Sequence, residues 1–310
     1  MTSKTRLPFD RELELLLPNV SELMAMAQTQ VRVEDILPSG VSHEEIKILG
    51  QDNNELILSV FRKTNTQSPN NQPCIYHIHG GGMIMGNRFS TLSGVLQFVH
   101  DFEVTCISIE YRLAPQHPDP ALLNDCFAGL HWIQQHADEI GINNHRIVIN
   151  GMSAGGGLAA GIALLCRDRK HEPPLLGQWL FSPMIDDFNN SNSANVFAGV
   201  GVWDQEANGA GWDAYLGDRR GTDNVTIYAA PARATDLSGL PSTYVDTGST
   251  ETLRDEGVEF PQNFWRDGTQ CELHVWPGAY HGFDGICGQA QLSIMARKAR
   301  EDWLRRLLFN

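Results

Sequence analysis

The most informative absences in this sequence are of basic charge and of long apolar runs. Its 310 residues carry 23 Lys and Arg against 37 Asp and Glu, a formal net charge of −14, which argues against nucleic acid or an anionic membrane as a partner. No apolar stretch reaches the length of a membrane span. Arg11, Glu12 and Glu14 interrupt the leucine-rich run near the N-terminus, so no signal peptide is predicted. We expect a cytoplasmic globular protein of one large or two smaller domains.

Cysteine is sparse and follows no pattern. The six cysteines form no CxxC pair and no tight framework, and four of them lie inside apolar strand or helix patterns. A disulfide scaffold would need closer and more regular spacing. We interpret them as reduced thiols that serve as small core residues in a reducing compartment; they are Cys74, Cys106, Cys126, Cys166, Cys271 and Cys287.

What the sequence does contain is a serine in a glycine-rich corner. The apolar run 146–150 leads into Gly151-Met152-Ser153-Ala154-Gly155, and 158–165 then reads as a buried helix. A strand, a sharp turn and a helix in this order fit the G-x-S-x-G pattern, which presents the Ser153 hydroxyl instead of packing it away. The backbone N–H of Ala154, at the start of the helix, is placed to stabilise an oxyanion.

The same glycines also match a loose dinucleotide fingerprint, Gly155-x-Gly157-x-x-Ala160. That motif normally opens a βαβ unit with an acidic residue near the end of the next strand, and none is apparent here. We therefore predict no cofactor.

A second glycine cluster follows the predicted strand 73–79. Successive residues without a Cβ let backbone N–H groups approach a ligand oxygen, so Gly81 and Gly82 are predicted to complete an oxyanion hole with Ala154. His77 and His79 share one face of this strand, but no further ligand lies nearby at metal spacing, and no metal site is predicted. We interpret His79 as an organiser of the loop and His77 as a core residue.

Strands and helices alternate along the rest of the chain. This order predicts an α/β fold with a mostly parallel eight-stranded sheet and helices on both faces. The segment 188–226 is irregular and predicts a lid, with Trp203 and Trp212 as candidate pocket residues or simple anchors. The strands are predicted at 44–49, 55–62, 73–79, 104–110, 146–150, 177–181, 242–247 and 271–276, and further helices at 10–32, 121–140, 253–267 and 289–308.

Functional side chains gather where parallel strands end. Ser153, Glu251 and His281 follow three such ends, in the chain order nucleophile, acid, base. His281 would take the proton of Ser153 during attack on an ester carbonyl, and Glu251 would orient the imidazole. Asp255 and Glu256 compete for the acid role, although acidic residues in the first turn of a helix are expected for dipole reasons alone.

Five separated motifs resemble those of the hormone-sensitive-lipase-like branch of the α/β-hydrolase carboxylesterases. They are His79-Gly80-Gly81-Gly82, Tyr111-Arg112-Leu113-Ala114-Pro115, the serine corner with Gly156, Leu253-Arg254-Asp255-Glu256-Gly257 and His281-Gly282-Phe283. Within that branch, residues 227–231 and 233–237 resemble the bacterial heroin esterase group.

The resemblance implies a serine carboxylesterase for short-acyl esters that works without a cofactor. It further implies N-terminal cap helices within residues 1–43, a catalytic domain over 44–310 with a cap insertion around 188–226, and a homodimer through the last strand and helix. Two residues depart from the family pattern: Met152 stands where a small polar residue is usual, and Glu251 replaces an aspartate. We predict a pocket lined by Met83, Met152, Trp203, Trp212 and Phe283.

Two other functions stay open from the residues. An amidase or lactonase would use the same three groups. A small-molecule-binding member of the fold, such as the plant gibberellin receptors, has lost the histidine, so the presence of His281 argues against that reading.

Overall fold

The computed structural model describes residues 6–17, 30–66 and 70–309. Within these residues eight strands form one sheet in the order β1-β2-β4-β3-β5-β6-β7-β8. The first three in this order pair antiparallel, and every pair from β4 to β8 is parallel, which confirms the predicted sheet. The strands are β1 (Val41–Leu49), β2 (Glu55–Lys63), β3 (Gln72–Ile78), β4 (Thr105–Glu110), β5 (Ile142–Met152), β6 (Gly177–Phe181), β7 (Ser242–Gly248) and β8 (Cys271–Trp276).

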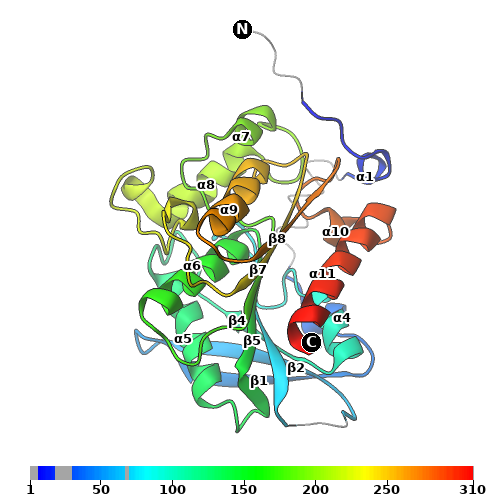
Figure 1. The fold of residues 1–310 in the computed structure, drawn as a ribbon, viewed down its shortest axis with the longest axis vertical. Coiled ribbons are helices and arrows are strands. Elements are labelled where there is room, and N and C mark those ends of the chain that lie inside the picture. The colour runs from blue at the N-terminus through cyan, green and yellow to red at the C-terminus, as the bar shows by residue number, and fades with distance from the viewer. Residues whose placement is uncertain (1–5, 18–29, 67–69, 310) are drawn as a thin grey trace.

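Helices cover both faces of the sheet (Figure 1). On one face lie α4 (Ser93–Phe102) and α11 (Gln291–Phe309), and on the other lie α5 (Ala121–Gln135), α6 (Ala154–Asp168) and α9 (Arg254–Arg266). The remaining helical elements are α1 (Arg11–Leu15), α3 (Val33–Ile36), α7 (Asn192–Val196), α8 (Gln205–Leu216), η1 (Gly217–Arg219), η2 (Pro231–Arg233) and α10 (Phe283–Ile286).

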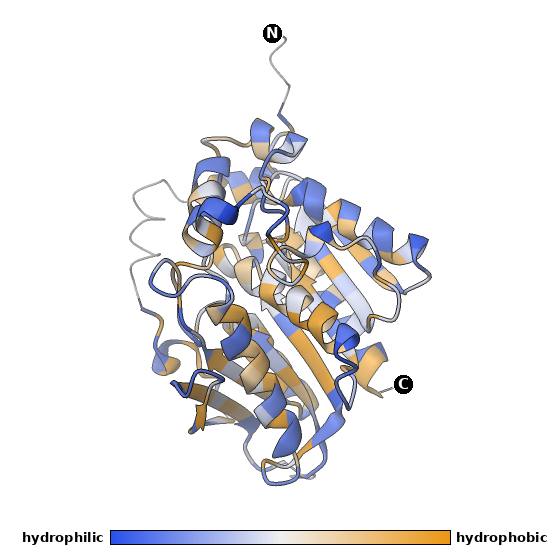
Figure 2. Ribbon diagram, turned by 90° about the vertical axis from the view of Figure 1, so that its left-hand side faces the viewer, coloured by the Kyte–Doolittle hydropathy of each residue, from blue (hydrophilic) through white to orange (hydrophobic). Residues whose placement is uncertain are grey.

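The two faces bury separate apolar layers because successive strand residues point to opposite sides. Trp179 and Phe181 pack on the side of α4 and α11, whereas Leu180 packs among the helices of the other side. Figure 2 shows apolar residues concentrated in the central strands and polar residues on the outward parts of the helices. All residues of β3 and β6 are buried, as expected for central parallel strands.

The N-terminal arm packs beside the loop that follows β8. Asp10 caps α1 by accepting hydrogen bonds from the N–H groups of Glu12 and Leu13, and its own N–H donates to Gly278 O at 2.8 Å. Leu13 is buried in an apolar cluster with Tyr280. Of the helices predicted over 10–32, α1 is observed, and residues 18–29 lie outside the described residues. A role for this arm as a cap over the substrate stays a prediction.

Two segments differ from the sequence expectations. The helix predicted over 121–140 ends at Gln135, where His136 leaves helical geometry with φ −108° and ψ 18° and its Nδ1 donates to Trp132 O at 2.9 Å. The segment 188–226 contains α7 and α8, although α8 is rich in residues of low helix propensity. A Cβ on Gly211 would lie 2.6 Å from Gly82 O, so glycine there lets α8 pack against the second glycine cluster.

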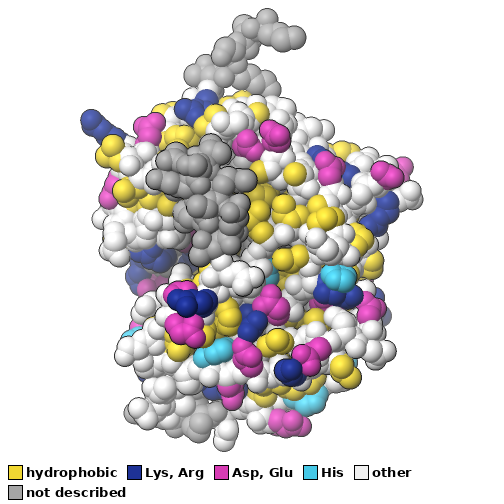
Figure 3. All heavy atoms as spheres, turned by 180° about the vertical axis from the view of Figure 1, so that it is seen from behind, with side chains coloured by type: hydrophobic (Ala, Val, Ile, Leu, Met, Phe, Trp, Pro, Cys, Tyr) yellow, Lys and Arg dark blue, Asp and Glu magenta, His cyan; other side chains and the backbone are white. Residues whose placement is uncertain are grey.

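The cysteines are all buried and free, in line with their prediction as core residues. Burial raises the pKa of the Cys166 thiol to about 12. Among the described helices, none is long and apolar enough to cross a membrane. On the face drawn in Figure 3, acidic and basic side chains are interspersed without a continuous basic field.

Candidate active site

Ser153 occupies the strained corner between β5 and α6. Its backbone has φ +57° and ψ −123°, a conformation that L-residues rarely adopt. The Ser153 N–H donates to Phe181 O at 2.8 Å, which ties the corner to the end of β6. A Cβ on Gly155 would lie 2.1 Å from Ile78 O, so only glycine lets α6 start this close to β3. The hydroxyl therefore stands at the carboxyl edge of the sheet, as predicted.

The second glycine cluster lies directly beside this corner. A Cβ on Gly80 would lie 3.4 Å from Cβ of Ser153. Gly81 and Gly82 have φ of +124° and +61°, which glycine adopts without strain. The N–H groups of Gly81, Gly82 and Ala154 donate to no acceptor among the described residues. Free N–H groups thus stand on the loop beside the serine corner and at the start of α6, and groups of this kind can stabilise an oxyanion.

His79 holds this loop in place. Its Nδ1 donates to Gly80 O at 2.7 Å, and its ring stacks on Tyr111 with 4.2 Å between centroids. Burial lowers the pKa of His79 to about 3, so the ring is neutral and acts through hydrogen bonding. His77 bonds Asn150 at 2.7 Å inside the core. Both histidines have the structural roles predicted from the sequence.

Glu251 and His281 form a buried pair. His281 Nδ1 lies 2.5 Å from Oε2 of Glu251. The other carboxylate oxygen, Oε1, accepts from Ser182 Oγ at 2.7 Å, from Thr247 Oγ1 at 2.6 Å and from Gly248 N at 2.6 Å. Burial acts to raise the pKa of Glu251, but the charge of His281 and these hydrogen bonds outweigh it and lower the pKa. The carboxylate is therefore ionised and aimed at the imidazole.

The loops of Ser153 and His281 touch. A Cβ on Gly282, next to His281, would lie 3.1 Å from Cε of Met152, next to Ser153. Neither the Ser153 hydroxyl nor His281 Nε2 has a hydrogen-bond partner in the part of the chain that the structure describes. In enzymes without substrate such contacts are often long and tighten when substrate binds.

The comparisons with known proteins agree with this geometry. The model of the alpha/beta hydrolase fold family matches residues 75–285. Esterase LipI from Mycobacterium tuberculosis is 32% identical over 216 residues, covering 70% of this chain and 67% of its own. Carboxylesterase NlhH from the same organism is 32% identical over 215 residues, covering 69% and 67%. The solved structure of a bacterial heroin esterase superposes with a TM-score of 0.87 at 34% identity, covering 97% of this chain and 98% of its own.

The chain belongs to the α/β-hydrolase family. Within it, the resemblance to the hormone-sensitive-lipase-like branch and to bacterial heroin esterase is confirmed.

In this α/β-hydrolase the two rival acids bind groups other than the imidazole. Asp255 accepts from Ser193 N at 2.7 Å and from Arg254 Nε at 2.7 Å. Glu256 accepts from Ile185 N at 2.8 Å. Glu251 follows the end of β7, and three donors hold its Oε1. Its role as the catalytic acid stays a prediction.

The buried carboxyl of Glu256 predicts a pH dependence of the protein's stability. Burial raises its pKa well above the usual 4.5, so ionisation favours the unfolded chain as pH rises above that value. We expect Glu256→Gln to leave Tm nearly unchanged near pH 5 and to raise it near pH 8. Each kcal/mol gained in the free energy of unfolding corresponds to a rise of about 2–4 °C in Tm. Thermal unfolding at the two pH values measures this. Glu259→Gln, an exposed site on the same helix, is the control. A Tm difference that does not grow with pH would contradict the raised pKa.

Of the five predicted pocket residues, Met83, Met152 and Trp203 lie at the corner. Cε of Met83 approaches within 3.7 Å of a Cβ on Gly157, and a Cβ on Gly82 would lie 2.3 Å from Cη2 of Trp203. The outer edge of the Trp203 ring therefore packs against the loop of Gly82. Its own O accepts from Thr252 Oγ1 at 2.8 Å, which joins the insertion to the acid loop.

The other two predicted pocket residues lie in apolar clusters. Trp212 is fully buried in the main core, and Phe283 packs in the cluster that holds Leu13 and Tyr280. Their role as pocket residues stays a prediction.

Sequence reasoning missed Ser182 and Thr247, the two hydroxyls that hold Glu251. Both stand at strand ends: Ser182 directly follows β6, and Thr247 is the last residue but one of β7. A polar residue at the carboxyl end of a buried parallel strand was the available signal.

Proposed function

We propose that this carboxylic ester hydrolase cleaves short-acyl esters through an acyl-enzyme intermediate on Ser153. His281 acts as general base and acid, Glu251 orients it, and the N–H groups of Gly81, Gly82 and Ala154 form the oxyanion hole. The observation that carries this proposal is the 2.5 Å contact between Glu251 and His281, on a loop that touches the serine corner.

In the acylation step, Ser153 Oγ attacks the ester carbonyl carbon while His281 Nε2 takes its proton. The carbonyl oxygen becomes an oxyanion, which the free N–H donors can bind without rearrangement; each such donor is typically worth about 10²–10³-fold in rate. His281 then gives the proton to the departing alcohol as the carbon–oxygen bond breaks. The acyl group is left as an ester of Ser153.

Deacylation repeats the sequence with water. His281 removes a proton from the water molecule, the hydroxide attacks the acyl carbon, and the proton returns to Ser153 Oγ as the acid leaves. The imidazole is cationic twice in each cycle. Glu251, ionised and anchored by its three donors, stabilises that cation and keeps Nδ1 protonated so that Nε2 faces the reaction.

A short acyl group is supported by the packing at the oxyanion loop. Trp203 lies against Gly82, and the buried Met83 follows directly in the chain. These two bulky side chains border the free N–H donors, where the acyl carbonyl would sit. Dimerisation through β8 and α11 is also proposed on the family resemblance and stays to be tested.

The acyl-length dependence tests this proposal. We expect kcat/KM for p-nitrophenyl esters to be highest for acetate or butyrate and to fall at least about tenfold by octanoate, because each unaccommodated methylene costs about 1–3 kcal/mol. Trp203→Ala removes the ring from Gly82 and should shift the optimum to longer chains.

A maximum at dodecanoate in the unaltered protein would contradict the short-acyl assignment. Faster hydrolysis of matched anilides or lactones than of any ester would move the function to the amidase or lactonase alternative.

A further inference from the structure

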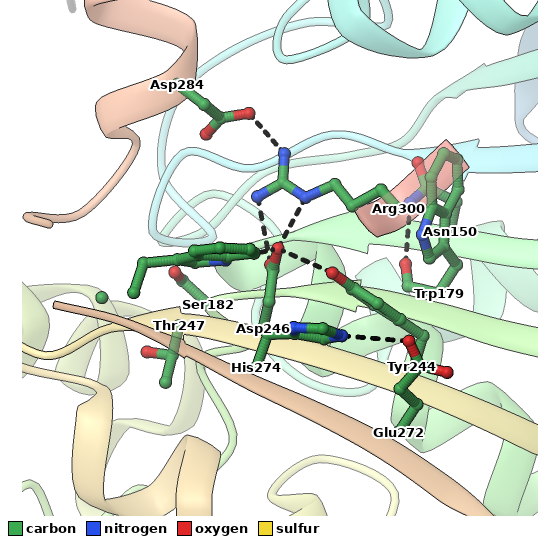
Figure 4. Close-up of polar contacts among 12 residues, drawn as sticks. Asn150, Trp179, Ser182, Tyr244, Asp246, Thr247, Glu272, His274, Asp284 and Arg300 are labelled. Atoms are coloured by element: carbon green, nitrogen blue, oxygen red, sulfur yellow. Dashed lines mark hydrogen bonds and ion pairs between the residues drawn. The ribbon is translucent and has the colours of Figure 1, made fainter. Parts of the chain in front are cut away.

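A buried arginine on the last helix contacts segments from three parts of the site. Arg300 of α11 is only 6% exposed. Its Nε and Nη2 donate to Oδ2 and Oδ1 of Asp246 at 2.7 and 3.1 Å, and its Nη1 donates to Asp284. The centre of the guanidinium lies 3.9 Å from the ring centroid of Phe181. Figure 4 shows the guanidinium between Asp246 and Asp284.

Each of these three contacts leads to one member of the proposed catalytic set. Phe181 O accepts the N–H of Ser153 at 2.8 Å. Asp246 O accepts the N–H of Ser182 at 2.7 Å. The Ser182 hydroxyl in turn donates to Glu251 Oε1 at 2.7 Å.

Asp284 supplies the third connection. It stands three positions after His281, in α10, and α10 begins at Phe283. The loop of His281 is therefore tied to α11 through a charged hydrogen bond, and α11 is tied to the sheet through the bidentate pair with Asp246.

The chemistry at Arg300 requires a guanidinium. A planar fork can pair with one carboxylate through two parallel N–H groups while a third N–H reaches another carboxylate and the face lies on an aromatic ring. The Asp246 carboxylate is also held by Trp276 Nε1 at 3.1 Å and Tyr244 Oη at 3.3 Å, so its position is fixed from several sides. A lysine ammonium could keep the charge but not all these directions.

We propose that Arg300 is a positioning residue for ester hydrolysis. By holding Asp246, Asp284 and Phe181 together, it sets the loop of His281 against the strand ends that carry Ser153 and Glu251. The inference rests on the proposed function. Without the bond between Arg300 and Asp284, the loop of His281 would be less firmly held. A displacement of the imidazole by about 1 Å can lower the rate about 100-fold.

The decisive variant is Asp284→Asn, which weakens only the tie to the histidine loop. We expect kcat with p-nitrophenyl butyrate to fall about tenfold while KM stays within about twofold, because orientation and not substrate binding is lost. Arg306→Met is the matched control: it removes another ion pair of α11, with Glu272, away from the catalytic loops, and should leave kcat unchanged.

Changes at Arg300 itself extend the test. Arg300→Met should lower kcat about 100-fold, and Arg300→Lys should restore part of it. Because the first leaves Asp246 buried without its partner and can unfold the protein, the conclusion is drawn from Asp284→Asn. Wild-type kcat in a folded Asp284→Asn protein would overturn the proposal.

A readout without turnover separates this proposal from the proposed function. The His281 proton shared with Glu251 should give a far-downfield proton NMR resonance, identified by its loss in His281→Ala. We expect it to be sharp in the wild type and in Arg306→Met, and broadened or lost in Asp284→Asn. An unchanged resonance would overturn the role of Arg300, whereas a protein that hydrolyses no ester but shows the broadening would contradict only the proposed function.

Discussion

Replacing Ser153 by alanine should reduce kcat for p-nitrophenyl butyrate by roughly 10⁶-fold. Without the hydroxyl no acyl-enzyme can form, and the remaining oxyanion donors and imidazole give only the residual rate left after loss of a nucleophile. The substitution removes one oxygen at a site where the backbone conformation is maintained by Phe181 O and the glycines, so folding should persist. Steady-state rates and covalent labelling by a fluorophosphonate, read by intact mass, measure both expectations.

Ser238→Ala is the control for this change, because Ser238 is an exposed loop serine before the start of β7, at the opposite end of that strand from Thr247. It should keep wild-type rates and one fluorophosphonate adduct. Undiminished turnover or labelling in Ser153→Ala would remove the nucleophile from the proposed mechanism.

Glu251→Ala should lose about 10⁴-fold in kcat, the typical cost of removing the carboxylate that orients a catalytic histidine. The change leaves Nδ1 of His281 without its partner. The imidazolium that forms during the reaction is then buried without a counter-charge. Asp255→Ala should lose less than about tenfold, since its carboxylate binds Ser193 N and Arg254. Rates for the two variants at saturating ester, together with their Tm values, make the comparison.

Glu251→Asp is a further control. The three donors at Oε1 place the carboxylate for a glutamate, and a side chain one methylene shorter cannot satisfy them and reach His281 together. We expect an intermediate loss. A larger effect at Asp255 than at Glu251 would transfer the acid role to Asp255.

The sheet and the corner could be predicted because their signals are local. The central strands β3 and β6 are short and fully buried, and β6 and β8 were predicted to the residue. The serine corner depends on glycines at fixed offsets, which sterics at Gly155 require. The positions of Glu251 and His281 followed from one rule about the carboxyl ends of parallel strands.

What could not be predicted depends on distant partners. Arg300 lies 54 positions from Asp246 and 16 from Asp284. No sequence pattern around these residues indicates that they form ion pairs with one another. Helix α8 has weak helical propensity and owes its place to tertiary packing on Gly82. Helix α5 ends at Gln135, five residues before the predicted end, at a non-helical backbone conformation of His136.

The docking of the N-terminal arm bears on how the molecule matures. Gln291 N donates to Glu12 at 2.9 Å, and the Asp10 N–H donates to Gly278 O, so this arm contacts residues that lie up to 279 positions later in the chain. Vectorial synthesis at about 5–20 residues per second keeps these partners apart for many seconds. Because α11 contacts both Glu12 of this arm and Asp284, three positions after His281, we expect a nascent chain stalled before α11 to lack these two contacts.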